Sequence, residues 1–258
     1  MGGFAGGPGG IAAKLLAKPL LIHEQNAVAG TTNKILAPLA NRVLQAFPAA
    51  FLGNKKAVTV GNPVRADIRA VHAEKQAGQA LNVLVLGGSL GAKAINEAMP
   101  VVAKDLLGQI HLLHQSGSRH INDVKALYTA AELVESESIK ISAFIDDMAA
   151  AYAWADVVIC RSGAMTVSEV AAAALPAVFI PFPYAIDDHQ TANAQWLVDA
   201  GAAILMPQNT MTVETLEEIL KSFIADPKLL QEMQEKAAAV AIHNASEVVA
   251  KICLELAS

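Results

Sequence analysis

The residues best suited to chemistry stand where short apolar runs give way to glycine-rich segments. The run Val83–Leu86 is followed by Gly87-Gly88-Ser89-Leu90-Gly91-Ala92, whose glycines let backbone amides approach a diphosphate and whose serine can donate a hydrogen bond to it. The spacing is not G-x-G-x-x-G, and the next apolar run ends in His114-Gln115-Ser116, with no acidic side chain to read an NAD ribose. The segment therefore favours a phosphate ligand other than NAD over a dehydrogenase cofactor. A tight turn without any ligand is the alternative.

A second segment of this kind follows the apolar run Val157–Cys160 and reads Arg161-Ser162-Gly163-Ala164-Met165-Thr166-Val167-Ser168-Glu169. Its glutamate is expected in the first turn of a helix, where the helix dipole favours a negative charge. A carboxylate in that position can accept hydrogen bonds from both vicinal hydroxyls of a ribose. Thr166 and Glu169 also have the spacing of a capping box, which is the purely structural alternative.

A third segment runs from Pro181 to Asn193 and places two amide side chains, Gln190 and Asn193, one helical turn apart. Amide side chains both donate and accept hydrogen bonds, as binding of sugar hydroxyls requires. Helix surfaces also carry such residues for solubility, so the pair alone does not define a sugar site.

The same residues are compatible in part with other chemistries. The stretch Gly87–Gly91 matches G-x-S-x-G, and Asp188 and His243 follow it in the order of a serine-hydrolase triad, but no oxyanion-hole motif precedes it. The pairs Asp146-Asp147 and Asp187-Asp188 have no third ligand, so helix N-capping is the favoured interpretation. The seven histidines show no metal-binding spacing. We therefore expect no metal ion and no cofactor.

These segments need a scaffold, and from about residue 82 the chain alternates short apolar runs with helical stretches. The alternation predicts an α/β fold with a doubly wound, Rossmann-like parallel sheet, whose ligands bind beyond the carboxyl ends of the strands. The strands are expected at Val83–Leu86, Ile110–His114, Ile139–Phe144, Val157–Cys160, Ala177–Pro181 and Ala203–Met206. The helices are expected at Ala92–Leu107, Ile121–Leu133, Met148–Ala155, Thr166–Ala174, His189–Ala200 and Val213–Ile224.

Residues 1–63 have a different pattern and are expected to be the remnant of an N-terminal α/β lobe. A glycine-rich opening precedes two predicted strands, Leu20–Ile22 and Arg42–Ala46, which flank a predicted helix at Thr32–Ala40. Two or three strands with one or two helices are barely stable alone, so this part is expected to pack on another lobe. The predicted division is residues 1–63 and residues 64–258, the second part being closed by the helix Glu247–Ala257.

Composition narrows the class of protein further. Of the 258 residues, 53% are hydrophobic and only 17% charged, which suits a sheet buried under helices. The net charge of −5 and the 5% of aromatic residues argue against a nucleic-acid partner. Cys160 and Cys253 match no disulfide or metal spacing and are expected to be buried, in a reducing cytoplasm. No apolar run reaches the ~18–20 residues that cross a bilayer, so the protein is expected to be at most peripheral to a membrane.

Taken in order, several segments resemble those of the MurG family, glycosyltransferases of the two-lobed GT-B class. The resemblance covers the whole chain, and it is carried by many modest motifs in one order. They are Gly6-Gly7-Pro8-Gly9-Gly10, His23-Glu24-Gln25-Asn26, Gly61-Asn62-Pro63-Val64-Arg65, Gly87-Gly88-Ser89-Leu90-Gly91-Ala92, His114-Gln115-Ser116-Gly117, Phe144-Ile145-Asp146-Asp147-Met148 and Arg161–Glu169.

The resemblance implies a UDP-sugar site. Uracil would stack near Phe144 and be read by the backbone of Ile145, and Glu169 would hold the ribose. Ser89 and Arg65 would contact the diphosphate. Further substrate-binding residues implied by the resemblance are Asn26, Ala164, Met165, Thr166, Val167, Ser168, Gln190 and Asn193.

The family's activity is the inverting transfer of N-acetylglucosamine from UDP-N-acetylglucosamine to the 4-hydroxyl of the muramoyl sugar of lipid I. The product is lipid II, and the resemblance implies a cytoplasmic protein, peripheral on the inner face of the bacterial cell membrane. Family chains begin with a histidine-containing glycine loop that has no counterpart here, so truncation is expected and the general base is unassigned. His23 and Glu24 are expected to orient their loop. The alternatives are a non-catalytic UDP-sugar-binding module and a sugar-nucleotide epimerase, for which no carboxylate is suitably placed.

Overall fold

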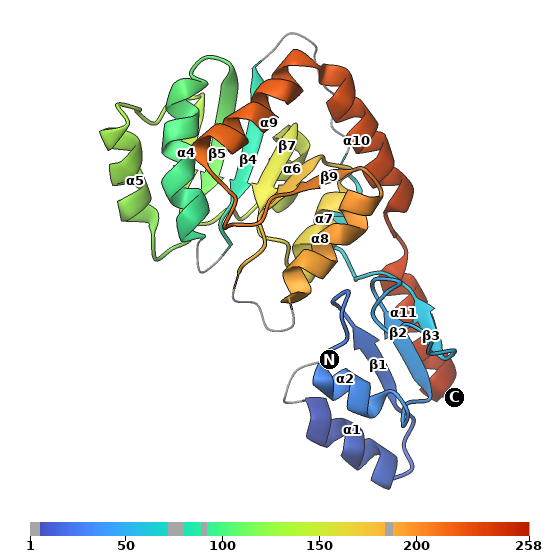
Figure 1. Ribbon diagram of the computed structural model, residues 1–258. Helices are drawn as coiled ribbons and strands as arrows, with labels where there is room; N and C mark the ends of the chain where they lie inside the picture. Colours follow the sequence, from blue (N-terminus) through green and yellow to red (C-terminus); the bar gives the residue numbers. More distant parts are fainter. Residues whose placement is uncertain (1–5, 72–79, 89–91, 184–187, 258) are drawn as a thin grey trace.

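The computed structural model describes residues 6–71, 80–88, 92–183 and 188–257 and forms two lobes, each built on a parallel sheet (Figure 1). The larger sheet has six strands in the order β6-β5-β4-β7-β8-β9. They are β4 Leu81–Leu86, β5 Ile110–Gln115, β6 Ile139–Ser142, β7 Val157–Cys160, β8 Ala177–Phe179 and β9 Ala203–Leu205. The predicted α/β class and the six predicted strands are confirmed.

Successive residues of β4 alternate between two hydrophobic cores. Val83 and Val85 are buried in one cluster, whereas Leu84 and Leu86 are buried in the other. This is the two-residue period of a strand. Because both faces are covered, the strand is an uninterrupted apolar run, as is typical of parallel sheets between two helical layers.

Helices cover both faces of the larger sheet (Figure 1). The first core contains residues of α4 Lys93–Asp105, α5 Ile121–Ala130 and α9 Val213–Ala225. The second contains residues of α6 Met148–Trp154, α7 Ala164–Ala172 and α8 His189–Asp199. The helix α10, Pro227–Val240, contributes to both cores through Leu230 and Ala237, respectively.

A buried polar cluster lies in the first core. The ring of His114 on β5 contacts the Tyr128 hydroxyl at 2.9 Å through Nδ1 and the side-chain oxygen Oδ1 of Asn96 at 3.0 Å through Nε2. All three residues are buried, and burial lowers the pKa of His114 to about 3. The imidazole therefore remains neutral and serves the packing of α4 and α5 on the sheet.

The smaller lobe has three strands in the order β1-β2-β3. They are β1 Leu21–Glu24, β2 Arg42–Gln45 and β3 Ala57–Thr59, joined with α1 Gly6–Leu15 and α2 Thr31–Leu36. This lobe also packs on the larger one, because Phe47 and Val64 belong to the second core and the Phe47 ring meets Trp196 edge-on at 5.3 Å. The predicted boundary between residues 63 and 64 stays a prediction.

The helix α1 was not expected from its glycine-rich sequence. Glycine and proline disfavour helix interiors, so the local sequence predicts a loop. Its packing explains the helix: a Cβ at Gly10 would lie 2.6 Å from Leu36 Cδ1, so the missing side chain lets α1 and α2 approach closely.

The C-terminal segment leaves α10 and ends in α11, Ala245–Ala257, beside the smaller lobe (Figure 1). Arg69, in the short helix α3 (Ala66–Arg69), forms an ion pair with Glu247 at 3.3 Å and donates to the carbonyl of His243. Gly61 has φ 80°, and a Cβ there would lie 2.8 Å from Ile242. The closing helix is confirmed, and these contacts fasten it to the connection between the lobes.

Among the described residues, one helical stretch, Pro227–Ala257, has the length and mean hydropathy, 1.3, of a membrane-crossing helix. The sequence alone predicted no stretch long and apolar enough to cross a bilayer, and this helical stretch is an exception by length and composition. The stretch comprises α10 and α11, which are separated by residues 241–244. Length and composition alone are weak evidence for a membrane-crossing helix.

Two smaller expectations need correction. Cys160 is buried as expected, but Cys253 is exposed on α11, because its side of the helix has no packing partner among the described residues. Asp147 caps α6 through a hydrogen bond from the Ala150 amide at 2.9 Å, as predicted. Asp188 occupies the N-cap of α8 without a side-chain capping bond, because its backbone is left-handed there. Asp187 lies outside the described residues.

Candidate functional site

The strand order reverses beside β4, and the reversal creates the candidate site. From β4 the chain moves outward through β5 to β6, and then returns to the other side of β4 as β7. Leu86 and Cys160, the last residues of β4 and β7, are paired in register. Ligands of doubly wound sheets bind outside the carboxyl ends of the strands at such a switch point. The first two predicted segments therefore leave the sheet side by side.

The segment after β4 turns at Gly88, whose φ of 72° is left-handed and suits glycine. Among the described residues, no atom lies within 4 Å of the place that a Cβ would take there. The helix α4 then begins at Lys93, and its N-cap Ala92 provides no side-chain cap. Its first amides are free of a side-chain cap, as anion binding at a helix N-terminus requires. Ser89, the predicted phosphate contact, lies outside the described residues.

The segment after β7 leads directly into α7. Its N-cap Gly163 has no side chain, so the first amides of α7 are also uncapped by a side chain. The helix begins at Ala164 rather than at Thr166, which places Glu169 in the second turn. The predicted capping box of Thr166 and Glu169 is therefore wrong, because neither residue stands at the N-cap.

The predicted contacts on α7 differ in exposure. Val167 is fully buried and Ala164 nearly so, which leaves mainly their backbone for a ligand. The hydroxyl of Ser168 donates to the Ala164 carbonyl at 2.9 Å, so it serves the helix. The partly exposed residues among these contacts are Met165, Thr166, Ser168 and Glu169.

Glu169 is half-buried beside the larger lobe's second core. Burial raises the pKa of its carboxyl, and this effect is opposed by a hydrogen bond from Tyr152 and by the charge of Arg65. The Tyr152 hydroxyl donates to Glu169 Oε2 at 3.1 Å. A partly desolvated carboxylate forms stronger hydrogen bonds than one in water, so Glu169 is suited to bind hydroxyl groups.

Phe144 and Ile145 form the turn between β6 and α6. Phe144 is 56% exposed, and its backbone carbonyl accepts a hydrogen bond from the Ser142 hydroxyl at 2.5 Å. Ile145 is half-buried and packs against the second core. The turn is thus held at one end by Ser142 and at the other by the Asp147 cap, with an aromatic face left accessible.

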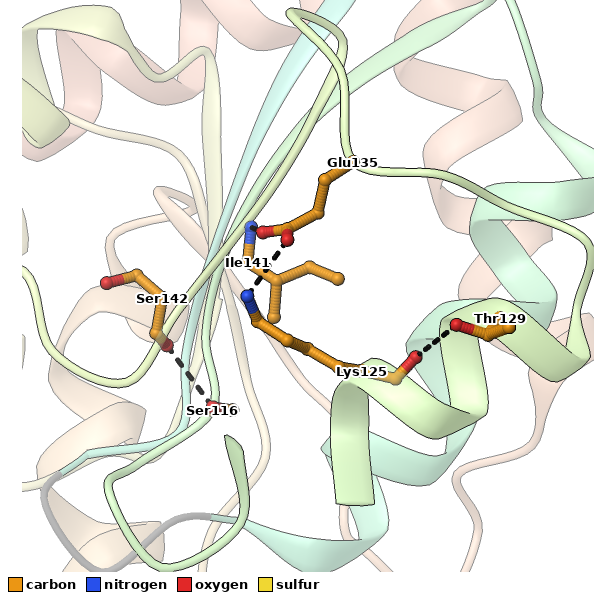
Figure 2. A network of polar contacts seen from close by, with 6 residues as sticks. All are labelled: Ser116, Lys125, Thr129, Glu135, Ile141 and Ser142. Atoms are coloured by element: carbon orange, nitrogen blue, oxygen red, sulfur yellow. Dashed lines mark hydrogen bonds and ion pairs between the residues drawn. The ribbon is translucent and has the colours of Figure 1, made fainter. Parts of the chain in front are cut away.

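The strand β6 that carries this turn lies at the edge of the sheet, and its outer edge is covered (Figure 2). Glu135 accepts a hydrogen bond from the Ile141 amide at 3.3 Å and forms an ion pair with Lys125 at 2.9 Å. On the inner edge, the Ser116 amide donates to the Ser142 carbonyl at 2.9 Å. Edge strands are prone to pair with other chains, and these contacts block that pairing while fixing the start of the turn.

Asn26 and Asn193 meet where the two lobes face each other. Asn193 Nδ2 donates to Asn26 Oδ1 and to the Ser162 carbonyl, each at 3.2 Å. Asn193 Oδ1 accepts from the Ala27 amide at 2.7 Å. Asn193 is fully buried, so both ends of its amide are occupied by the protein in this arrangement.

Asn62 forms a second link between the lobes that the sequence analysis did not identify. Its Nδ2 donates to the Gln25 carbonyl and to the Ser168 hydroxyl, each at 3.0 Å. The residue is buried, and its side-chain oxygen has no hydrogen-bond partner among the described residues. Its place in the Gly-Asn-Pro motif was the available signal.

Arg161 fastens the segment after β7 to the segment after β8. Its guanidinium donates to the carbonyls of Ile180 and Pro181, each at 2.9 Å, and to Gln208 Oε1 at 2.6 Å. Gln190, predicted to contact the sugar, accepts a hydrogen bond from the Phe182 amide at 2.9 Å through its side-chain oxygen. This leaves the Gln190 amide nitrogen as its available donor. Gln208 was not identified from sequence, since only the fold brings it here.

Arg65 precedes α3 and is largely exposed. Its guanidinium lies 3.7 Å from Asp67, an exposed ion pair that contributes little to stability. Its charge lowers the pKa of Glu169, so it lies on the same side of the molecule as α7. An exposed side chain held only by a weak ion pair can turn toward a diphosphate.

His23 and Glu24 organise the segment that follows β1. His23 Nε2 contacts the Gly61 carbonyl at 3.0 Å. Glu24 accepts hydrogen bonds from the amides of Asn26 and Gly30 at 3.0 and 2.9 Å, and from Asn33 Nδ2 at 2.8 Å. Burial alone raises the pKa of Glu24, but these hydrogen bonds hold it below the ordinary value. Both side chains therefore orient the loop, as expected.

The paired lobes and the loops at the switch point define a class of protein, the GT-B glycosyltransferases. The chain is similar to the crystal structure of Acinetobacter baumannii MurG, with a TM-score of 0.86 and 44% sequence identity. The match covers 99% of this chain and 73% of the MurG chain. A S. aureus MnaA–UDP co-structure has a TM-score of 0.68, and a protein described as a UDP-N-acetylglucosamine 2-epimerase from Listeria monocytogenes has 0.67. At 15% identity, both show the fold alone.

Sequence comparison gives the particular family. The C-terminal domain of glycosyltransferase family 28 matches residues 82–250, and the N-terminal domain of that family matches residues 1–45. Two relatives are named UDP-N-acetylglucosamine--N-acetylmuramyl-(pentapeptide) pyrophosphoryl-undecaprenol N-acetylglucosamine transferase. The one from Shewanella denitrificans is 50% identical over 100% of this chain, and the one from Methylococcus capsulatus is 48% identical over 99% of it. In each case the chain spans 71% of the relative's length. The chain belongs to glycosyltransferase family 28. This membership replaces the serine-hydrolase and dehydrogenase hypotheses.

Proposed function

We propose that this chain transfers N-acetylglucosamine from UDP-N-acetylglucosamine to the 4-hydroxyl of the muramoyl sugar of lipid I, giving lipid II with inversion at the anomeric carbon. The observation that carries the proposal is the meeting of the Gly88 turn and the Glu169 helix at the β4–β7 switch point. A second support is the 50% sequence identity to a relative whose name includes this donor and this acceptor.

UDP leaves in this reaction, and negative charge grows on its diphosphate. The uncapped amides that begin α4 and α7 supply fixed donors, and Arg65 adds a positive charge. Each preorganised donor in a water-excluded site contributes up to roughly 3–4 kcal/mol to the stability of the developing charge. Ser89 adds a hydroxyl donor. The chain therefore has the parts to stabilise the leaving group.

The uridine is bound by three features of the larger lobe. The exposed face of Phe144 stacks on uracil, and the backbone of Ile145 reads its edge. The Glu169 carboxylate accepts hydrogen bonds from the ribose hydroxyls. The first residues of α7, from Ala164 through Met165, Thr166, Val167 and Ser168, approach the ligand through their backbone and their partly exposed side chains.

The sugar is bound where the lobes meet, by Asn26, Gln190 and Asn193. Because both hydrogens of Asn193 Nδ2 are already donated, a sugar hydroxyl that accepts from this nitrogen replaces the hydrogen bond between Asn193 and Asn26. Donor binding is therefore coupled to a small rearrangement at the interface between the lobes. Such an exchange conserves the number of hydrogen bonds.

The membrane side of the protein is the outer face of the smaller lobe, and it docks on the inner face of the cytoplasmic membrane. Between α1 and α2 lies a groove of about 690 Å³, lined almost entirely by apolar atoms, including those of Ile11 and Leu15. Leu15 and Leu16 are 82% and 71% exposed, and the exposed Lys14 and Lys18 stand beside them. Apolar side chains flanked by lysines suit an anionic bilayer surface, where the lipid-linked acceptor resides.

The second candidate function is a UDP-sugar-binding module without transferase activity. It is favoured by the engagement of both Glu24 carboxylate oxygens in structural hydrogen bonds, which leaves this carboxylate unsuited to act as general base. The two candidates share the donor site and differ in the acceptor step.

The test is a transfer assay with the purified chain, radiolabelled UDP-N-acetylglucosamine and a lipid I analogue. Labelled product with stoichiometric UDP, lost in Glu169→Ala, is the expected result. Donor binding without product would select the binding module, and the absence of both would overturn the two candidates together.

A further inference from the structure

One buried hydroxyl at the candidate site has no part in the proposed transfer. Tyr152 lies on α6 with its side chain fully buried in the second core. Its hydroxyl is 3.1 Å from Glu169 Oε2 and donates to it. Because the ring is fixed by packing, the donor has a fixed position, and so has the carboxylate oxygen that accepts from it.

The helix that carries Tyr152 also begins at the turn that holds Phe144. Asp147 caps α6, with 2.9 Å between its Oδ1 and the Ala150 amide, and Tyr152 lies just over one turn further along. The hydroxyl therefore joins α6, the helix behind the base-stacking turn, to α7, the helix that presents Glu169. The hydrogen bond therefore fixes the distance between the turn that would bind the base and the carboxylate that would bind the ribose.

We infer that Tyr152 is a positioning residue that holds Glu169 in the orientation for vicinal ribose hydroxyls, and so helps the protein select ribonucleotides. The inference rests on the proposed UDP-sugar function. A carboxylate has about four acceptor positions, and one hydrogen bond at Oε2 leaves the remaining positions for the two hydroxyls. A side chain that is already ordered loses less conformational entropy when the ligand binds.

The same hydrogen bond acts on the charge of the carboxylate. Burial raises the pKa of Glu169, and the hydrogen bond from Tyr152 opposes this rise because it stabilises the ionised form. Removing the hydroxyl therefore leaves Glu169 less ordered and raises its pKa further, so that more of the carboxyl is protonated. Both changes weaken contacts with ribose hydroxyls and leave contacts with the base and phosphates unchanged.

The experiment is calorimetric titration of the whole chain with UDP and with 2′,3′-dideoxy-UDP, which lacks both hydroxyls. Tyr152→Phe removes only the phenolic oxygen. We expect the Kd for UDP to rise by about tenfold, the effect of one hydrogen bond to a charged group, and the Kd for the dideoxy analogue to change by less than about twofold. The ratio of the Kd for the dideoxy analogue to the Kd for UDP, which measures the preference for UDP, therefore becomes smaller in Tyr152→Phe.

Tyr128→Phe is the matched control, because Tyr128 is equally buried and its hydroxyl bonds His114 in the opposite core. It is expected to lower stability and to leave the preference for UDP unchanged. Glu169→Gln is the second variant: adding Tyr152→Phe to it should narrow the preference no further, because Tyr152 acts through the carboxylate. Thermal melts verify that each variant is folded.

An unchanged preference in folded Tyr152→Phe would overturn the inference and leave the donor site standing. Equal weakening of UDP and of the analogue would show a merely structural role and overturn it likewise. A wild-type chain that binds neither compound would overturn the proposed function, and the inference with it.

Discussion

Asn193 in the larger lobe accepts a hydrogen bond from the Ala27 amide in the smaller lobe, with 2.7 Å between Asn193 Oδ1 and Ala27 N. Its Nδ2 donates to the carbonyl of Ser162 at 3.2 Å, and the side chain is fully buried. The lobes are thus joined by directional contacts as well as by the packing of Phe47 on Trp196. The donor-side loops are positioned by both lobes together.

Asn193→Ala is therefore expected to destabilise the protein by about 1–3 kcal/mol, because it leaves buried partners unpaired. Denaturant unfolding measures the free energy, and hydrogen exchange at the Ala27 amide should become faster. Gln195→Ala, which removes a hydrogen bond to Asp199 on the surface of the same helix, is the control and should cost less than about 0.5 kcal/mol. Equal stability of both variants would show that the lobes do not meet in this way in solution.

Glu24 predicts a pH dependence of stability. Hydrogen bonds hold its folded-state pKa below the ordinary value of a glutamate, so its contribution is fully present above that ordinary value and is lost as the pH falls through the folded-state pKa. Glu24→Gln should destabilise the protein by about 1–3 kcal/mol at pH 7, because its amide group places donors against donors. The difference should shrink as the medium is acidified. Unfolding curves at a series of pH values check this, and a constant difference would contradict it.

Arg161→Lys tests the link between the segments after β7 and β8. A lysine ammonium cannot reproduce the planar fork that reaches Ile180, Pro181 and Gln208, so we expect a loss of about 1–3 kcal/mol in the free energy of unfolding. The control is Arg42→Lys, where the guanidinium makes one exposed hydrogen bond to the adjacent Asn41. Equal effects of the two changes would count against the link.

The membrane face predicts binding to anionic vesicles. Replacing Leu15 and Leu16 by serine should lower the partition constant by at least about tenfold, because each buried leucine contributes about 1.5–3 kcal/mol. The control is Leu254→Ser on α11, also 72% exposed, which should have little effect. Co-sedimentation at low and high salt measures both variants. Undiminished binding of the double variant would place the membrane contact elsewhere.

The larger sheet was predictable from sequence because its strands are uninterrupted apolar runs and its helices have a regular period. The two strand ends at the switch point, Leu86 and Cys160, were each predicted correctly, yet their pairing was not. Strand order is set by long-range packing, and the local sequence pattern does not determine it. The sequence predicted that the loops after β4 and β7 lie along the same edge of the sheet, and the structure adds that their strands are direct neighbours.

The remaining errors have a common cause, the dominance of tertiary contacts over local preference. A helix at Gly6–Leu15 contradicts helix propensity and depends on Leu36 packing at Gly10. Tyr152 stands in an alanine-rich helix and resembles an ordinary core residue, since its partner Glu169 lies on another helix. Glu169 itself was found by its position after a strand, although the helix begins two residues earlier than predicted.

The most direct measurement is calorimetric titration of the chain with UDP-N-acetylglucosamine, beside Glu169→Ala and with NAD as a control ligand. The account predicts saturable binding of the UDP-sugar, weakened in Glu169→Ala by roughly tenfold or more, as for loss of hydrogen bonds to a charged group, and no binding of NAD. Binding should also weaken as the pH falls, because protonation of Glu169, whose pKa is raised by burial, removes an acceptor. A wild-type chain that does not bind the UDP-sugar, or a variant that binds it equally well, would contradict the account.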